Sequence, residues 1–472
     1  MDEKYLENSY KRTADGYFKK YRSYMEAIEK SPLSKARSIT QFDHYALGQM
    51  LEQWENIVAM CEADGSIADL GLLPRIAQDV ISVSFGTSPL AIIASVQPIE
   101  EETGLVYYKR LIAKDTFGNI DADQNLVNPE TGLAEIPSGY ASAKISDELL
   151  TAADGSTVTY EALSLNNTPV RPQSVVVKYT ISGTDYEAPD DGSGVVSGAY
   201  MNGTVNYTTG VVNLYFQTGY SPSISDDIYA DYQVNLETSS DIREITSELT
   251  TKTVKAHPYA LKGTVGLLKK FQLMKKFGQM AEDDLAMDLT NMINVEIFGD
   301  LLRKMVANAQ GTTTFDATVP SYYSEHDHRQ NMNLYLAKAE KVLVQNAGRG
   351  TRSFYIGGAT FCEYMSTIEG FKILYDGASI TGSHLYGTLG GAPVIRVPQD
   401  TNVIATNKAI IGYKGLSVFE APTVYAPYMP LMVTSMLPMS NPLMNQRAAA
   451  CWSAVEVLVK QFLTNFTVSN AT

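Results

Sequence analysis

The chain has 472 residues, of which 44% are hydrophobic and 19% charged, and its formal net charge is −15. This composition excludes a largely disordered chain, and the length predicts two or three domains. Its three cysteines, Cys61, Cys362 and Cys451, lie far apart without a CxxC pair, which indicates buried, reduced thiols rather than a disulfide framework.

The first 75 residues predict a helical N-terminal arm. Over Gly16–Lys30, apolar residues such as Phe18, Tyr21 and Met25 recur every three or four positions, and a second helical stretch covers Tyr45–Ala63. The arm has too few apolar residues to hold a core alone, so we expect it to lie on other structure. The N-terminus has acidic residues and no apolar run, so no signal peptide is expected.

Residues 76–116 predict strands and the start of an extended loop, because Gly104–Lys114 is dense in strand formers between two turn-like segments. From 117 to 240, short strands alternate with glycine- and aspartate-rich turns, which predicts an inserted small β-sandwich or barrel. Within it, Gly203–Phe216 predicts a hairpin in which Gly210 permits a positive φ. Residues 241–258 are expected to form the returning strand.

This insertion holds most of the acidic charge. Between Asp115 and Ser240 there are 17 acidic residues against Lys144, Arg171 and Lys178, a balance of −14, which leaves −1 for the rest of the chain. No long basic run predicts tight nucleic-acid binding. We expect so acidic a domain to face the solvent and to keep the protein soluble.

Residues 259–328 are dominated by one long predicted helix. Leu285, Leu289, Ile293 and Ile297 recur every four residues, which predicts a long helix, with Ala281 to Ala307 as its span if it runs unbroken. Such a helix would be about 40 Å long at 1.5 Å per residue, which exceeds the usual length in globular domains.

Residues 329–430 predict a compact α+β lobe. A helix over 329–350 has Gly348 and Gly350 as candidate C-terminal stops, and it is followed by strands at 352–358, 392–398 and 408–415 and a helix at 359–371. Residues 431–472 predict strand or mixed structure that returns to the main body.

The segment Gly412–Met432 is apolar and stiff. It holds three tyrosines and three prolines, and no charge follows Glu420 until Arg447. The prolines exclude a membrane-spanning helix. Because proline fixes φ, we expect Ala426–Leu431 to be a rigid strap buried against other structure.

Catalytic and metal-binding signals are weak. The sequence has no GxxxxGK[ST], GxSxG or HExxH motif. His326 and His328 would face one side of a strand and could share a metal ion, but they lack a third ligand at a known spacing. Cys362 with His384 is a candidate nucleophile and base without a supporting motif. We therefore expect no catalytic, metal or cofactor site, and a metal- or thiol-dependent enzyme is the alternative that these residues leave open.

One segment resembles a known family. Residues 411–431, IGYKGLSVFEAPTVYAPYMPL, resemble the signature of the T-even type phage major capsid proteins, in which a GYKG turn precedes an APY-x-PL run. Residues 88–114, 252–305 and 349–365 are similar, in order, to the opening of that family's extended loop, its loop-return strand with spine helix, and the strand and helix of its axial domain. The resemblance covers most of residues 80–435.

The resemblance implies an α+β protein with the Hong Kong 97-type capsid fold. That fold has an N-terminal arm, an extended loop, a peripheral domain with a long spine helix, and an axial domain. The insertion at 117–240 would be carried on the extended loop, and the arm and loop are expected to reach over neighbouring subunits. The implied function is that of a major capsid protein of a tailed bacteriophage, which self-assembles into hexamers and pentamers of an icosahedral shell around double-stranded DNA.

The resemblance also implies partners and a location. The expected partners are copies of the chain itself, portal, scaffold and decoration proteins, and packaged DNA bound without sequence preference, with no membrane and no cofactor. Assembly is expected in the bacterial cytoplasm, and the product is the virion. A vertex or tail component of a phage is the alternative structural function.

The candidate assembly and packing residues lie in the segment that carries the resemblance. They are Gly412, Tyr413, Lys414, Gly415, Tyr425, Pro427, Tyr428 and Pro430. The two glycines permit a tight turn that would bring Lys414 within reach of a neighbouring carboxylate, and the tyrosines offer large apolar faces. Two interpretations stay open at this point: the segment joins two domains within one chain, or it contacts another subunit.

Overall fold

The computed structural model describes residues 3–31, 33–34, 37–63, 78, 81–82, 85, 89–115, 122–123, 142–224, 226–238, 243–277, 281–348, 350–374, 382–397, 403–415, 417–434, 436–441 and 443–471. The chain divides into two compact units: unit 1 is Met1–Ile112, Asn125–Ala134 and Ser247–Thr472, and unit 2 is Ala113–Gln124 and Glu135–Thr246. None of the described helices combines the length and the apolar character needed to cross a bilayer.

Among the described residues, unit 1 contains the helices and three sheets. Its helices are α1 (Glu3–Lys20), α2 (Arg22–Glu29), α4 (Gln41–Ala63), α7 (Leu90–Ile93), α8 (Leu267–Phe277), α9 (Ala281–Asn308), α10 (Glu325–Gln330), α11 (Met332–Ala347), α12 (Ala359–Ser366) and the 3-10 helix η1 (Lys460–Phe462). Its strands are β1 (Ala94–Val96), β2 (Thr103–Ala113), β11 (Ile245–Lys255), β12 (His257–Gly266), β13 (Thr312–Asp316), β14 (Phe354–Gly357), β15 (Phe371–Ile373), β16 (His384–Leu389), β17 (Ala392–Arg396), β18 (Lys408–Gly412), β19 (Thr423–Val433), β20 (Leu437–Pro438), β21 (Met444–Val457) and β22 (Leu463–Ser469). This mixture of helices and strands confirms the predicted α+β class.

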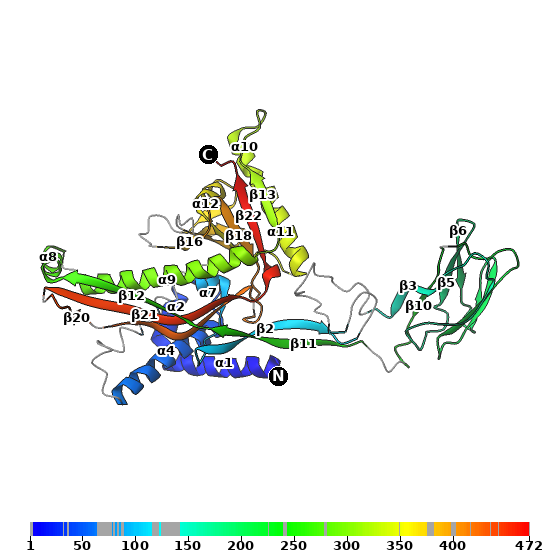
Figure 1. The fold of residues 1–472 in the computed structure, drawn as a ribbon, viewed down its shortest axis with the longest axis horizontal. Helices are drawn as coiled ribbons and strands as arrows, with labels where there is room; N and C mark the ends of the chain where they lie inside the picture. Colours follow the sequence, from blue (N-terminus) through cyan, green and yellow to red (C-terminus); the bar gives the residue numbers. More distant parts are fainter. Residues whose placement is uncertain are drawn as a thin grey trace. The chain divides into compact units, whose positions relative to one another are not determined.

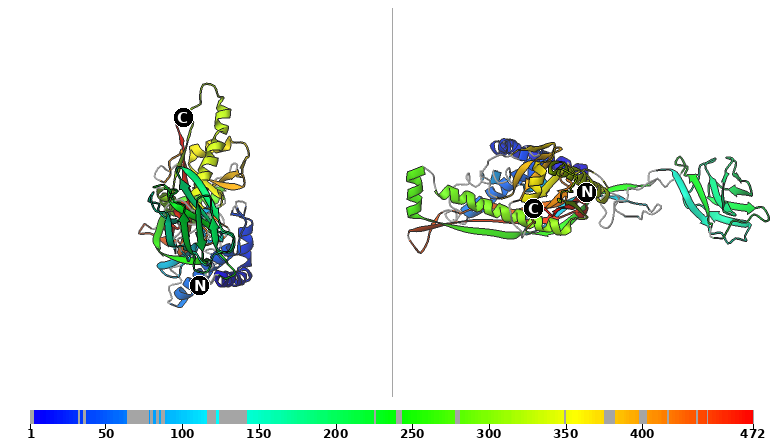
Figure 2. Two further views of the ribbon diagram at one scale, coloured as in Figure 1. Left: turned by 90° about the vertical axis from the view of Figure 1, so that its right-hand side faces the viewer. Right: turned by 90° about the horizontal axis from the view of Figure 1, so that it is seen from above.

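The five-stranded sheet and α9 form the centre of unit 1. The strand order is β1-β19-β21-β12, with β20 also pairing with β21. Helix α9 lies along β12 and β21 (Figures 1 and 2) and buries Leu289, Ile293, Ile297 and Leu301 in the largest core. The prediction of one unbroken helix from 281 to 307 is confirmed, since α9 ends one residue later.

A seven-stranded sheet forms a second lobe of unit 1. Its order is β13-β22-β18-β14-β17-β16-β15, and α11 and α12 pack on it around a core that includes Phe361 and Phe466. Helix α11 ends at Gly348, whose φ of 66° is left-handed, so the predicted C-terminal stop is confirmed. The sequence predicted this lobe over residues 329–430, but the sheet also contains β13 and β22, which lie outside that range. Parallel pairing, in which Thr312 lies opposite Asn465, brings these distant segments into one sheet.

The N-terminal helices pack onto their own chain. Met25 and Ile28 are 0% and 1% exposed, and they share one core with Leu47, Leu51 and the buried face of α9. The expectation that the arm would reach over neighbouring subunits instead of folding onto its own chain is therefore wrong for these helices. Two further differences are local: the predicted helix over Gly16–Lys30 is interrupted at Tyr21, and Leu90–Ile93 is a short helix within a segment expected to be β.

Unit 2 is a sandwich of two four-stranded antiparallel sheets. Its strands are β3 (Lys144–Thr151), β4 (Thr159–Ser164), β5 (Val176–Ile181), β6 (Thr184–Pro189), β7 (Val195–Ser197), β8 (Met201–Val205), β9 (Val211–Phe216) and β10 (Ile228–Gln233), in the orders β3-β10-β5-β6 and β4-β9-β8-β7. Both sheets contribute to one core, which includes Val177 and Leu214. The predicted β-rich insertion and its β8–β9 hairpin, with Gly210 at a φ of 73°, are confirmed.

Candidate assembly segment and the adjacent pocket

The GYKG turn, residues 412–415, begins at the end of a central strand. Gly412 is the last residue of β18 and is paired with Phe354 on one side and Leu463 on the other. A Cβ at this position would overlap the Phe354 ring, so that ring can lie across residue 412 because residue 412 is glycine. Gly415 closes the turn by donating its N–H to the Glu420 carbonyl at 2.7 Å.

Tyr413 packs at the edge of the second lobe. Its ring meets Phe462 edge-on, with centroids 5.0 Å apart, and a Cβ at Gly350 would overlap the same ring. The Tyr413 N–H donates to the Phe462 carbonyl at 3.0 Å. Tyr413 therefore joins η1 to the turn within one chain.

Lys414 crosses from the turn to the short helix α7. Its Nζ donates to the carbonyl oxygens of Ala94 at 2.6 Å, Ala91 at 3.0 Å and Ile92 at 3.5 Å. These carbonyls lie at the C-terminal end of α7, where backbone acceptors lack partners within the helix and a cation is favourable. The sequence predicted that Lys414 would reach a neighbouring carboxylate, but in this chain its hydrogen bonds go to backbone carbonyls.

A buried ion pair lies beside Lys414. The guanidinium of Arg37 donates twice to the Asp43 carboxylate, at 2.8 and 2.6 Å, and also to the Ala91 carbonyl at 2.9 Å. Thr40 donates its N–H and its hydroxyl to the same carboxylate, each at 2.8 Å. The Ala91 carbonyl is therefore shared by Arg37 and Lys414, which ties the N-terminal segment to the GYKG turn.

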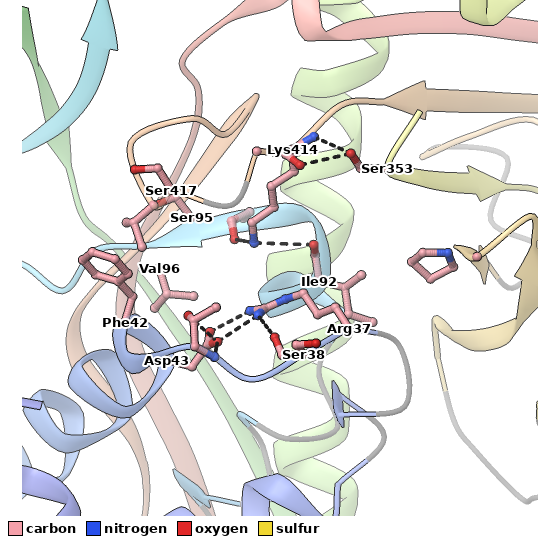
Figure 3. Close-up of a pocket in the computed structure, with 16 residues that line it drawn as sticks. Arg37, Ser38, Phe42, Asp43, Ile92, Ser95, Val96, Ser353, Lys414 and Ser417 are labelled. Atoms are coloured by element: carbon pink, nitrogen blue, oxygen red, sulfur yellow. Dashed lines mark hydrogen bonds and ion pairs between the residues drawn. The ribbon is translucent and has the colours of Figure 1, made fainter. Parts of the chain in front are cut away.

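These groups line a pocket of about 330 Å³ (Figure 3). Four serines, Ser38, Ser95, Ser353 and Ser417, add hydroxyl groups to its wall. Its walls therefore carry the Arg37 guanidinium, the Lys414 amine, the Asp43 carboxylate and several hydroxyls.

The electrostatics of the pocket are set by burial. Burial lowers the pKa of Lys414 to about 7 and the charge of Arg37 adds to this, whereas Asp43 acts in the opposite direction. The three carbonyl acceptors of Lys414 also favour its charged form. Burial alone would raise the pKa of Asp43, but the hydrogen bonds and charge of Arg37 outweigh it, so that this pKa lies below its usual value.

The proline-rich strap is a central strand of the five-stranded sheet. Strand β19 pairs with β1 on one side and β21 on the other, and Pro427 and Pro430 are buried in it. The pairing register of β19 with β21 shifts between Pro427 and Met429 and again between Met429 and Met432. Proline lacks a backbone donor and is tolerated inside a sheet at such irregularities.

The two tyrosines of the strap pack within unit 1. Tyr425 contacts the largest core, and burial raises its pKa. Tyr428 meets Trp452 edge-on, with ring centroids 6.1 Å apart. All eight candidate residues thus have contacts inside their own chain.

The alternative catalytic residues lie on three different elements: the two histidines on α10, Cys362 on α12 and His384 on β16. His326 and His328 lie on α10, where residues two apart point in different directions, and His328 Nε2 is 2.8 Å from the Asp316 carbonyl. Among the described residues no group of three His, Cys, Asp or Glu side chains is placed to hold a metal ion. Cys362 is fully buried, and burial raises the pKa of its thiol to about 12, which suppresses the nucleophilic thiolate.

Comparison with known proteins identifies a family for the chain. A family model described as "Major capsid protein Gp23" matches residues 90–451, which is more than half of the chain. No curated protein matches it.

Several solved structures from phages are similar to the chain. The jumbo bacteriophage PhiKZ capsid matches at 10% identity and a TM-score of 0.34, covering 80% of this chain and 91% of that chain. The capsid of Myoviridae phage XM1 matches at 9% identity and a TM-score of 0.31, covering 68% and 89%. A structure from Gordonia phage Cozz matches at 12% identity and a TM-score of 0.33, covering 50% and 76%. These TM-scores support no conclusion by themselves, so the assignment of the chain rests on the family match.

Proposed function

The chain belongs to the major capsid protein Gp23 family, and on that premise we propose that its copies form the hexamers and pentamers of a closed icosahedral shell around double-stranded DNA. As a member of this family it is a structural protein of a tailed-phage head, present in many copies in the virion. The expected pieces of the Hong Kong 97-type fold are also present: an N-terminal helical segment, the β2–β11 ribbon, the long helix α9 and an α+β lobe. This membership confirms the predicted function of a major capsid protein of a tailed phage, and the hexamers, pentamers and enclosed DNA belong to the proposal.

Several features support the finer proposal. Among the described strands, β2 and β11 pair with each other in a two-stranded sheet. This ribbon packs on unit 1 through Val106 and Val254, but more than half of the side chains of β11 are exposed, and a two-stranded ribbon is marginal by itself in water. We propose that it is completed by a neighbouring subunit. The candidate segment Gly412–Pro430 is proposed to act in assembly indirectly, by holding the two lobes of unit 1 in one geometry.

The remaining partners are proposals of the same kind. Portal, scaffold and decoration proteins, assembly in the bacterial cytoplasm and the absence of catalysis are expected of a shell protein. The acidic region that forms most of unit 2 is proposed to face outward, because a balance of −14 between Asp115 and Ser240 would repel packaged DNA.

Electron microscopy of the expressed full-length chain tests this proposal. We expect polyhedral shells in negative stain, and a reconstruction with the density of unit 2 on the outer surface. Tubes or isolated rings would favour a tail or vertex component instead. Shells with unit 2 on the inner surface would contradict the charge argument alone.

A further inference from the structure

Helix α8 exposes an apolar stripe that the described part of its own chain covers only in part. Leu267, Phe271 and Met274 are spaced four and three residues apart, which places them on one face, and they are 46%, 68% and 58% exposed. Leu268, at the edge of this face, is 71% exposed. A helix with such a stripe typically lays it on a complementary apolar surface.

The same helix is strongly basic. The segment Leu267–Phe277 contains Lys269, Lys270, Lys275 and Lys276 and no acidic residue. Lys275 follows Phe271 by four residues and therefore flanks the apolar stripe. A partner surface should accordingly combine exposed apolar side chains with acidic ones.

The outer face of the N-terminal half of α9 has these properties. Met287 and Met292 are 62% and 51% exposed, whereas Leu289 and Ile293 on the opposite face are buried in the core. Asp284 and Asp288, one turn apart, are also exposed between the methionines. This face is acidic and rich in methionine, a residue that adapts well to partner surfaces.

We propose that α8 of one subunit docks on the outer face of α9, residues 284–292, of a neighbouring copy of the same chain. Both surfaces lie at one end of the five-stranded sheet (Figure 1), where the Leu267 N–H donates to the Leu443 carbonyl at 2.8 Å and fixes the start of α8. Leu443, 50% exposed, extends the apolar surface.

Charge decides between this contact and its simplest rival. An α8–α8 contact would bring Lys275 of two subunits together, which costs free energy, whereas the α8–α9 contact pairs Lys275 with Asp288. Because both faces belong to every subunit, the contact can be repeated around a closed ring. The inference rests on the proposed function, since it names a contact within the proposed shell.

Exchange of the two charges tests the contact. Lys275→Glu would set two carboxylates against each other, and Asp288→Lys would set two ammonium groups against each other, so each single variant is expected to lower the yield of shells about tenfold or more. The double variant Lys275→Glu/Asp288→Lys restores an attractive pair and is expected to recover most of the yield. Lys276 lies about 100° around α8 from Lys275, away from the apolar stripe. Lys276→Glu is therefore the matched control and should assemble like the unaltered chain.

Failure of the contact and failure of the proposed function give different results. Urea unfolding of the soluble subunits checks that each variant is folded as stably as the unaltered chain. Single variants that assemble normally, or a double variant no better than the worse single one, would overturn the docking proposal. Failure of the unaltered chain to form any shell would count against the proposed function. If that chain also sedimented only as a monomer, the α8–α9 contact would be contradicted as well.

Discussion

Deletion of residues 1–40 is expected to destroy the soluble, folded subunit, and not only its ability to assemble. The deletion removes Tyr21, Met25, Ile28 and Leu33, which are 5%, 0%, 1% and 1% exposed in the same core as α9. Their loss would leave the partner surfaces of α4 and α9 open to water. The truncated chain is therefore expected in the insoluble fraction, with little native circular dichroism in what remains soluble.

A point variant measures the same effect without a truncation. Met25→Ala should lower the free energy of unfolding by about 2–5 kcal/mol, as for other buried methionines. Lys19→Ala, an exposed position on α1, is the matched control and should change it by no more than about 0.5 kcal/mol. A truncated chain that is folded and soluble but forms no shells would show that the arm acts between subunits.

Replacement of Asp43 by alanine is expected to be as costly as the loss of a large core side chain. The Asp43 side chain is 7% exposed and that of Arg37 is 22% exposed, and the two groups make a bidentate pair. Removal of one partner leaves the other as a poorly solvated charge, which costs about 3–5 kcal/mol. Urea unfolding of the subunit measures the loss, and the double variant Arg37→Met/Asp43→Ala should lose less than Asp43→Ala alone.

The same pair predicts a pH dependence. Because the pKa of Asp43 is lower in the folded than in the unfolded chain, its stabilisation is present above the unfolded pKa of about 3.9 and is lost as the pH falls through the folded value. Stability of the unaltered chain and of Asp43→Ala should therefore converge toward acid pH. Parallel curves between pH 7 and pH 3 would contradict this role.

The sequence predicted the elements whose signals are local. The spacing of four residues between Leu285, Leu289 and Ile293 identified α9, and Gly348 identified the end of α11. The alternation of short strands and turns identified the sandwich of unit 2. In each case the periodicity or the turn residue is itself the cause of the structure.

The arrangements that the sequence did not predict depend on distant contacts. Lys414 binds carbonyls more than 300 residues away, and nothing in a local pattern shows that the cation of this turn caps α7. The Arg37–Asp43 pair was missed because Arg37 lies in the connection before α4 and Asp43 lies within α4, and no single periodicity relates residues across such a boundary. The apolar stripe of the arm shows that the arm needs a partner surface, but it does not show which chain supplies that surface. The prediction that the arm reaches outward was wrong for this reason.

The central claim is that one copy of this chain is incomplete and that many copies complete each other as a shell. Sedimentation velocity of the purified full-length chain, at micromolar concentration and moderate salt, tests this claim most directly. We expect most of the mass in particles far larger than any small oligomer, in equilibrium with little free subunit. A single long-lived species at the 51.7 kDa mass of one chain, unchanged as the concentration rises, would contradict the account.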